Sequence, residues 1–250
     1  MTEPRAAAVL HTPHTPHTPR NIATAQIRAA LIDLDGTLVD TAQDFTAALN
    51  GMLAKLGARP VDRAEVLLYI GKGSENLIAR VLAARFDATQ AQALFQQAFD
   101  RYQTEYASVN GRYTQLYPEV KSGLDALRAA GIKLACVTNK PHRFAVELLQ
   151  HYGLLEYFAL VYGGDSWPRK KPDPMPMIEA CRALGVAAAH TVAIGDSEND
   201  ALAAAAGGLW SLTVPYGYNH GQPVQTIPAD GIVENLLQAA HLIVRSAAPH

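Results

Sequence analysis

The sequence predicts an α/β fold in which a doubly wound parallel sheet carries an inserted helical domain. From residue 27 onward, short apolar runs alternate with amphipathic stretches, and the apolar runs disappear between residues 42 and 115. Strands that alternate with helices are typical of a parallel sheet covered on both faces. We therefore expect a core of residues 27–41 and 116–250 and a helical insertion of residues 42–115.

Five apolar runs are expected to form the sheet. They are residues 28–33, 132–138, 159–164, 191–196 and 209–214. Three of them end in a residue that can react or bind a ligand, namely Asp33, Thr138 and Asp196. Because open parallel sheets bind ligands beyond the carboxyl ends of their strands, these three side chains should converge.

The insertion is expected to consist of amphipathic helices. Four stretches have this character, at residues 45–57, 63–71, 74–86 and 89–109. The last one carries an apolar stripe at helical spacing: Leu94, Phe95, Ala98, Phe99, Tyr102 and Tyr106. We interpret this stripe as core packing rather than as a binding surface.

Residues 1–26 are expected to form a disordered extension outside the fold. HTPHTPHTP at residues 11–19 places a proline at every third position, which excludes helix and sheet. A histidine tract can bind metal weakly, but the lack of apolar surface favours plain disorder.

The composition limits the partners. A formal net charge of −2 gives no electrostatic basis for binding nucleic acid or an anionic membrane. The chain has no apolar run long enough to span a bilayer and no signal-peptide core, so we expect a cytoplasmic protein. Cys136 and Cys181 lie in apolar patterns typical of buried residues, and the histidines show no metal-binding spacing.

Two aspartates one residue apart interrupt the first strand pattern, LIDLDGTLVD at residues 31–40. In an extended segment Asp33 and Asp35 point to the same side, and two carboxylates so close favour a bound cation. A capped turn would explain Asp35 and Gly36, but it gives no reason for Asp33 inside an apolar run.

Four ordered segments resemble the motifs of the haloacid dehalogenase (HAD) superfamily. They are LIDLDGTLVDT at 31–41, CVTN at 136–139, KKPDP at 170–174 and AIGDSEND at 193–200. The resemblance covers roughly residues 27–245 and implies a Rossmann-like core with a helical cap inserted after the first strand.

The resemblance implies chemical roles for the motif residues. Asp33 is the expected nucleophile, which forms an aspartyl-phosphate, and Asp35 the expected general acid and then base. Thr138 and Asn139 are expected to bind phosphate oxygens at a helix N-terminus. Lys171, directly before Pro172, would offset the phosphate charge, whereas Arg169 and Lys170 are expected at the surface.

A magnesium site follows from the same resemblance. Asp33, Asp196 and the backbone carbonyl of Asp35 are expected to hold Mg²⁺, with Asp200 supporting them through water or through Lys171. Acidic residues also stabilise the start of a helix, which is the alternative reading of GDSEND. Lys72, between Gly71 and Gly73, is either a ligand for a substrate carboxylate or an exposed loop lysine.

Longer stretches resemble the phosphoglycolate phosphatases within this superfamily. They are TNKP at 138–141, GGDSWPRKKPDP at 163–174 and VPYGYNHG at 214–221; one departure is Glu119, where relatives usually carry glycine. The implied activity is Mg²⁺-dependent hydrolysis of 2-phosphoglycolate by a monomer or homodimer. The alternative is a related capped phosphatase or phosphomutase that acts on a sugar phosphate or another small phosphorylated metabolite. Asp35 disfavours a dehalogenase, and a phosphonatase would need a Schiff-base lysine, for which Lys72 is the candidate.

Overall fold

A six-stranded parallel sheet forms the centre of the computed structural model, which describes residues 19–247. Its strand order is β5-β4-β1-β6-β7-β8. The strands are β1 (Ala29–Ile32), β4 (Lys133–Val137), β5 (Leu160–Tyr162), β6 (Thr191–Gly195), β7 (Trp210–Thr213) and β8 (Gly231–Ile232). Each of the five expected runs contains one of these strands, so the predicted fold class is confirmed; β8 is an addition.

The register brings the expected site residues to one edge of the sheet. Ile32, the last residue of β1, pairs with Cys136 of β4 and with Ile194 of β6. The Asp33 N–H then donates to the Ile194 carbonyl at 2.9 Å. Since all three strands run in the same direction, the residues that follow them meet beyond their carboxyl ends.

Helices cover both faces of this sheet. Alternate residues of β1 point to opposite sides: Ala30 and Ile32 pack in the cluster that contains α5 (Val120–Ala129), α6 (His142–His151) and α9 (Leu236–Ala247). Leu31 packs instead in the cluster that contains α7 (Met175–Leu184) and α8 (Glu198–Gly207). Complete burial of β1 explains its continuous apolar sequence.

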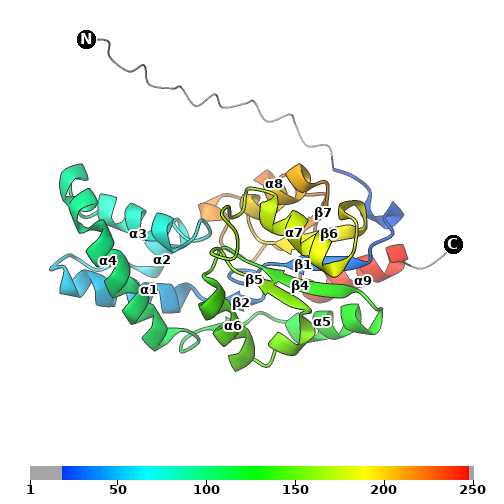
Figure 1. Ribbon diagram of the computed structural model, residues 1–250, viewed down its shortest axis with the longest axis horizontal. Helices are drawn as coiled ribbons and strands as arrows, with labels where there is room; N and C mark the ends of the chain where they lie inside the picture. Colours follow the sequence, from blue (N-terminus) through cyan, green and yellow to red (C-terminus); the bar gives the residue numbers. More distant parts are fainter. Residues whose placement is uncertain (1–18, 248–250) are drawn as a thin grey trace, which may run out of the picture.

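Four helices lie between the short antiparallel strands β2 (Val39–Asp40) and β3 (Gln115–Leu116), and we call them the cap helices. They are α1 (Ala42–Lys55), α2 (Arg63–Leu67), α3 (Ser74–Ala83) and α4 (Ala88–Val109). They extend to one side of the sheet (Figure 1) and share a hydrophobic cluster in which Leu49, Ile78 and Tyr102 are buried and to which the core contributes Phe144 and Tyr218.

The packed fold includes residues 19–26, which the sequence had assigned to the extension. Ile22 and Ala25 are buried in the main hydrophobic cluster. The Arg20 guanidinium pairs with Asp230 at 2.7 Å and lies over the ring of Trp210. These contacts correct the expected boundary at residue 27. Residues 1–18 lie outside the described residues. They include most of the HTP repeat, so the prediction of disorder there stays a prediction.

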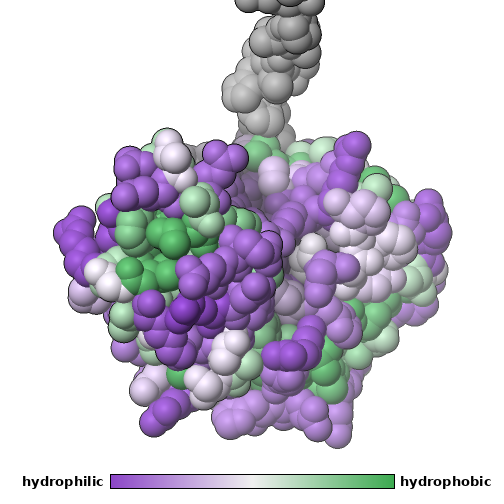
Figure 2. Space-filling model, turned by 60° about the vertical axis from the view of Figure 1, so that its left-hand side comes forward, coloured by the Kyte–Doolittle hydropathy of each residue, from purple (hydrophilic) through white to green (hydrophobic). Residues whose placement is uncertain are grey.

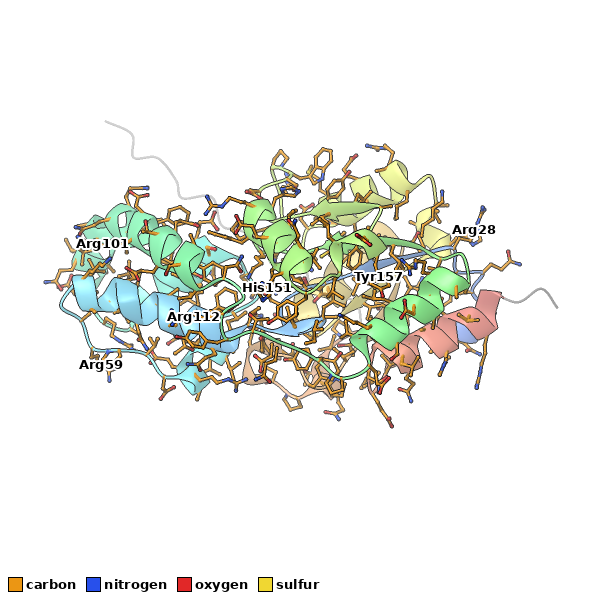
Figure 3. All side chains as sticks on the ribbon, turned by 90° about the horizontal axis from the view of Figure 1, so that it is seen from below. Arg28, Arg59, Arg101, Arg112, His151 and Tyr157 are labelled. Carbon is orange, nitrogen blue, oxygen red and sulfur yellow. The ribbon has the colours of Figure 1, made fainter. Side chains whose placement is uncertain are left out.

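Figure 2 shows a face covered mainly by hydrophilic residues, with hydrophobic ones gathered in patches. Arg59, Arg101 and Arg112 lie at separate places along the helical half of the molecule (Figure 3). Among the described residues, no helix combines the length and apolar character needed to cross a membrane.

The return from the cap helices to the sheet is held by one buried carboxylate. Asp44 of α1 accepts hydrogen bonds from the backbone N–H groups of Gly111 and Tyr113, at 2.8 and 2.7 Å, and from the Thr114 hydroxyl. Asp44 has no exposed surface. It therefore fixes where α4 ends relative to α1.

We expect Asp44→Ala to lower the free energy of unfolding by about 3 kcal/mol, because it leaves buried backbone donors without a partner. Urea unfolding followed by circular dichroism measures this change. The matched control is Asp100→Ala on exposed α4 surface, which should cost less than about 0.5 kcal/mol. Equal losses in the two variants would contradict the role assigned to Asp44.

Candidate active site

Three carboxylates converge beyond the carboxyl edge of the sheet. Asp33 follows β1, Asp196 follows β6, and Asp200 lies in the first turn of α8. One oxygen atom from each lies within 4.8 Å of the others. Three negative charges this close repel one another, so the cluster requires compensating positive charge.

Lys171 supplies part of that charge. Its Nζ atom lies 3.0 Å from Asp33 Oδ1 and 2.6 Å from Asp200 Oδ1, and it donates to the Val137 carbonyl at 2.7 Å. Burial alone would lower the pKa of Lys171, but the Asp200 and Asp33 carboxylates outweigh burial and raise the pKa above its ordinary value. The lysine therefore remains charged, yet one ammonium does not balance three carboxylates.

Burial and the remaining negative charge both affect the pKa values of two of these carboxyl groups. Burial raises the pKa of Asp33 from 3.8 to about 6, against the opposing effect of Lys171. Burial and the charges of Asp33 and Asp200 raise the pKa of Asp196 well above its usual range. A buried, all-oxygen donor set of this kind fits a hard divalent cation such as Mg²⁺.

The Asp196 carboxylate is held in one orientation from several sides. Thr37 Oγ1 donates to Oδ1 at 3.1 Å, and the Tyr218 N–H donates to Oδ2 at 2.7 Å. A side chain on Gly36 or Gly217 would collide with this carboxylate, so both positions require glycine. These neighbours fix the orientation of an oxygen donor that could bind a cation.

Asp200 has its oxygens engaged within the protein. Ser197 Oγ donates to Oδ2 at 2.8 Å in a capping box at the start of α8, while Lys171 donates to Oδ1. Asp200 thus fixes both the helix and the lysine. This arrangement supports the expectation that Asp200 acts on the site through Lys171; a direct contact with the metal stays a prediction.

Asp35 lies at the side of the site nearest to the cap helices. Its Oδ1 atom accepts from the Thr41 hydroxyl at 2.8 Å and from Lys140 Nζ at 3.1 Å. Lys140 also donates to the hydroxyl of Tyr106. Lys140 belongs to the TNKP stretch, from which no role was expected for it; its position two residues after Thr138, between a strand and Pro141, is the signal in the sequence.

Thr138 and Asn139 both line the pocket, but they are engaged differently. Thr138 Oγ1 accepts from the Lys140 N–H at 3.2 Å. Asn139 Nδ2 donates to the backbone carbonyls of Lys171 and Gly71, at 2.8 and 2.9 Å. Asn139 therefore links the core to the cap loop, and its buried Oδ1 atom has no partner among the described residues.

Lys72 lies outside the pocket that its neighbours help to form. Gly71 and Gly73 line the pocket, whereas the half-exposed Lys72 ammonium lies 3.7 Å from the Glu198 carboxylate. The structure therefore does not bring Lys72 together with the other expected site residues.

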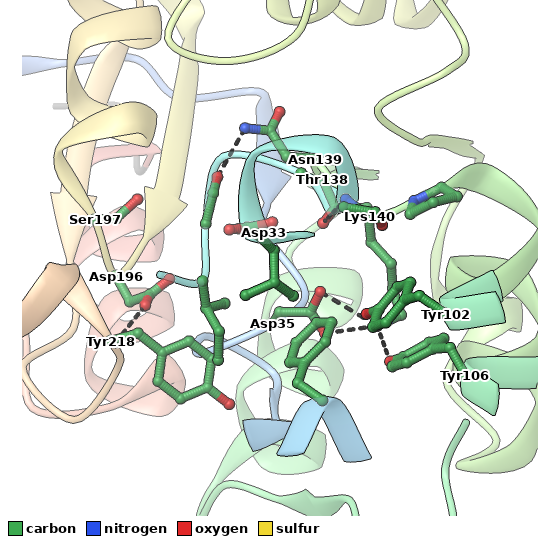
Figure 4. A pocket seen from close by; sticks show the side chains of 17 residues that line it. Asp33, Asp35, Tyr102, Tyr106, Thr138, Asn139, Lys140, Asp196, Ser197 and Tyr218 are labelled. Carbon is green, nitrogen blue, oxygen red and sulfur yellow. Dashed lines mark hydrogen bonds and ion pairs between the residues drawn. The ribbon is translucent and has the colours of Figure 1, made fainter. Parts of the chain in front are cut away.

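The pocket lies between the edge of the sheet and the cap helices (Figure 4). Its core-side lining includes Asp33, Asp35, Thr138, Asn139, Lys140 and Asp196, and its cap-side lining includes Phe45, Ile70, Leu77, Tyr102 and Tyr106. The two tyrosines belong to the α4 stripe that we had interpreted as core packing. They are indeed buried, but they also form a wall of this pocket.

The fold agrees with comparisons to known proteins. The family model "haloacid dehalogenase-like hydrolase" matches residues 27–208. The chain therefore belongs to the haloacid dehalogenase-like hydrolases.

Within that family, the relatives place the chain among the phosphatases. It is 44% identical to the phosphoglycolate phosphatase of Nitrosospira multiformis over 88% of this chain and 97% of that protein. It is 45% identical to a plasmid-encoded phosphoglycolate phosphatase of Cupriavidus necator over 83% of this chain and 89% of that protein. A predicted phosphoglycolate phosphatase from Haemophilus somnus superimposes with a TM-score of 0.81 at 30% identity, covering 87% of this chain and 98% of that one.

We expect stabilisation by Mg²⁺ to increase with pH. Because the pKa of Asp33 is raised from 3.8 to about 6, its protonated form favours the metal-free fold. The contribution of protonated Asp33 to the stability of the metal-free fold is complete below about pH 4 and is lost as the pH rises through about 6. Above that pH the ionised Asp33 carboxylate is available to a cation. The Mg²⁺-induced increase in Tm should therefore be small at about pH 5 and large at about pH 7.5.

Thermal unfolding with and without Mg²⁺ at the two pH values measures this dependence. Asp196→Asn should abolish the increase in Tm, while Asp100→Asn on the exposed surface of α4 should retain it. An equal increase at both pH values, or a full increase in Asp196→Asn, would argue against a magnesium site at these carboxylates.

Proposed function

We propose that the protein is a Mg²⁺-dependent phosphatase that hydrolyses 2-phosphoglycolate to glycolate and phosphate through an aspartyl-phosphate on Asp33. The observation that carries the proposal is the position of Asp33, which lines the pocket beside the Lys171 ammonium and within the carboxylate cluster. The names of the relatives support the substrate. A cytoplasmic location is part of the same proposal.

Asp33 provides the nucleophile. An ionised carboxylate attacks phosphorus without prior deprotonation, and the Leu34 N–H, which donates to Asp33 Oδ1 at 2.7 Å, restricts its orientation. Lys171 lies 3.0 Å from Asp33 and offsets the repulsion between this carboxylate and an incoming phosphate. Mg²⁺, held by Asp33, Asp196 and the Asp35 backbone carbonyl, would neutralise negative charge on the transferring phosphoryl group.

Thr138 and the start of α6 are placed to bind the phosphate. Thr138 follows β4 directly and is buried in the pocket lining. The backbone N–H groups that precede α6 lie at the positive end of that helix, where they favour an anion. Together with Lys171 they would hold the phosphate oxygens while Asp33 attacks.

Asp35 is placed to move protons. It lies two residues after the nucleophile, in a turn closed by the Gly36 N–H donating to the Val39 carbonyl at 2.8 Å. Thr41 and Lys140 hold its carboxyl group at the side where the alcohol would leave. It would donate a proton to the leaving oxygen, and then accept one from the water that hydrolyses the aspartyl-phosphate.

We expect Asp33→Asn to lower phosphate release by about 10³-fold or more, because the amide cannot attack phosphorus. The assay measures inorganic phosphate from 2-phosphoglycolate with Mg²⁺, and circular dichroism verifies the fold of each variant. Asp100→Asn, on the surface of α4, is the matched control and should retain wild-type turnover. Unchanged turnover in Asp33→Asn would overturn the mechanism.

Substrate identity requires a separate experiment. We expect the wild type to have its highest kcat/KM on 2-phosphoglycolate in a panel that also contains sugar phosphates, and to release one phosphate for each substrate consumed. A clear preference for a sugar phosphate would overturn the substrate. Substrate conversion with little phosphate release would indicate a mutase instead.

A further inference from the structure

A buried lysine and a buried tyrosine line the pocket without a substrate contact in the hydrolysis as proposed. The side chain of Lys140 is 1% exposed, and its Nζ atom lies between Asp35 and the hydroxyl of Tyr106. Tyr102 lies one helical turn before Tyr106 on α4 and is equally buried. Figure 4 shows these side chains together at the side of the pocket formed by α4.

The Tyr102 hydroxyl is the unusual group in this wall. It is buried and has no hydrogen-bond partner among the described residues. Its ring stacks on Tyr106 with centroids 5.6 Å apart, which fixes the direction of the hydroxyl. Burial raises the pKa of Tyr102 well above 10, so the group keeps its proton and remains a donor. A buried donor without a partner is unfavourable, and a ligand acceptor in the pocket would remove that cost.

Lys140 provides a charge next to this donor. The Lys140 ammonium donates to both oxygens of Asp35, at 3.1 and 3.3 Å, and to the Tyr106 hydroxyl, so a ligand acceptor would share or replace the longer Asp35 contact. The surroundings are otherwise apolar, since Lys140 Nζ lies 4.7 Å from the ring centre of Phe45. In such surroundings a charge-assisted hydrogen bond is stronger than in water.

The order of the groups matches the order of atoms in a small phosphate ester. In the proposed reaction Asp33 attacks phosphorus and Asp35 protonates the ester oxygen, and Lys140 lies next to that proton donor, since its Nζ atom is 3.1 Å from Asp35 Oδ1. A substituent one carbon beyond the ester oxygen would therefore reach Lys140 and the tyrosine wall.

We propose that Lys140 and Tyr102 form a subsite that binds the carboxylate of a phosphorylated α-hydroxy acid and so determine substrate specificity. This assignment rests on the proposed phosphatase activity and deepens it, because it names the residues that distinguish an acid from a neutral ester. Lys140 would then have two functions: it would bind the substrate carboxylate, and it would orient Asp35.

The test compares two esters that differ at this one substituent: 2-phosphoglycolate, which carries the carboxylate, and ethyl phosphate, which carries a methyl group there. The wild type should prefer 2-phosphoglycolate in kcat/KM. Tyr102→Phe removes only the hydroxyl, and should reduce that preference by about 10- to 100-fold, mainly through KM for the acid. Tyr113→Phe, at an exposed tyrosine outside the pocket, is the matched control and should keep the wild-type preference.

A second variant tests the charge. Lys140→Met should also reduce the preference, and in addition lower kcat on both esters because Asp35 loses a partner. A Tyr102→Phe enzyme that keeps the wild-type preference, or that loses activity equally on both esters, would overturn the subsite while the phosphatase proposal stands. A wild type without preference for the acid would overturn the proposed substrate and the subsite together.

Discussion

The crowding of carboxylates at the carboxyl ends of β1 and β6 is the constraint on which the rest of this structure depends. Asp33, Asp196 and Asp200 approach one another within 4.8 Å in a buried setting, where like charges are strongly unfavourable. Lys171 reduces this cost but does not remove it. The surrounding fold must therefore hold the carboxylates in place although part of their negative charge stays uncompensated by the protein.

The carboxylates are held in place by steric fit to nearby backbone as well as by electrostatic interactions. Gly36 and Gly217 allow backbone to approach the Asp196 carboxylate, and Gly195 does the same for Asp200. The capping box of α8 uses Asp200 both to start the helix and to hold Lys171. The strength of this framework comes from the buried parallel strands, since a shift of β1 by one residue would turn Asp33 away from the site.

The sequence predicts the residues that follow the core strands better than it predicts the residues of the pocket wall, for a physical reason. Asp33, Thr138 and Asp196 follow apolar strands, so pattern alone indicates that they meet. Lys140 and Asp35 are 105 residues apart and also follow neighbouring strands, β4 and β1, but they lie in loops, and the sequence pattern does not show which loop side chains turn toward each other. Likewise, tyrosines in a helical stripe have the same pattern whether they face a core or a pocket, and Arg20 gains its place through Asp230 and Trp210, which are distant in the sequence. Glu119 was a readable signal, because its left-handed backbone (φ 61°) is one that glycine adopts more easily.

The cap helices and the metal-ligand side are connected through Tyr218. Its N–H orients Asp196, while its hydroxyl accepts from the Thr41 N–H at 2.7 Å and donates to Asp40 at 2.9 Å, where the chain leaves the sheet for α1. Thr41 in turn holds Asp35. A displacement of the cap helices would therefore reach the proposed acid and a proposed metal ligand through two or three hydrogen bonds. Since Tyr102 and Tyr106 lie on those same helices, binding at the pocket wall and alignment of the reacting groups depend on the same cap position.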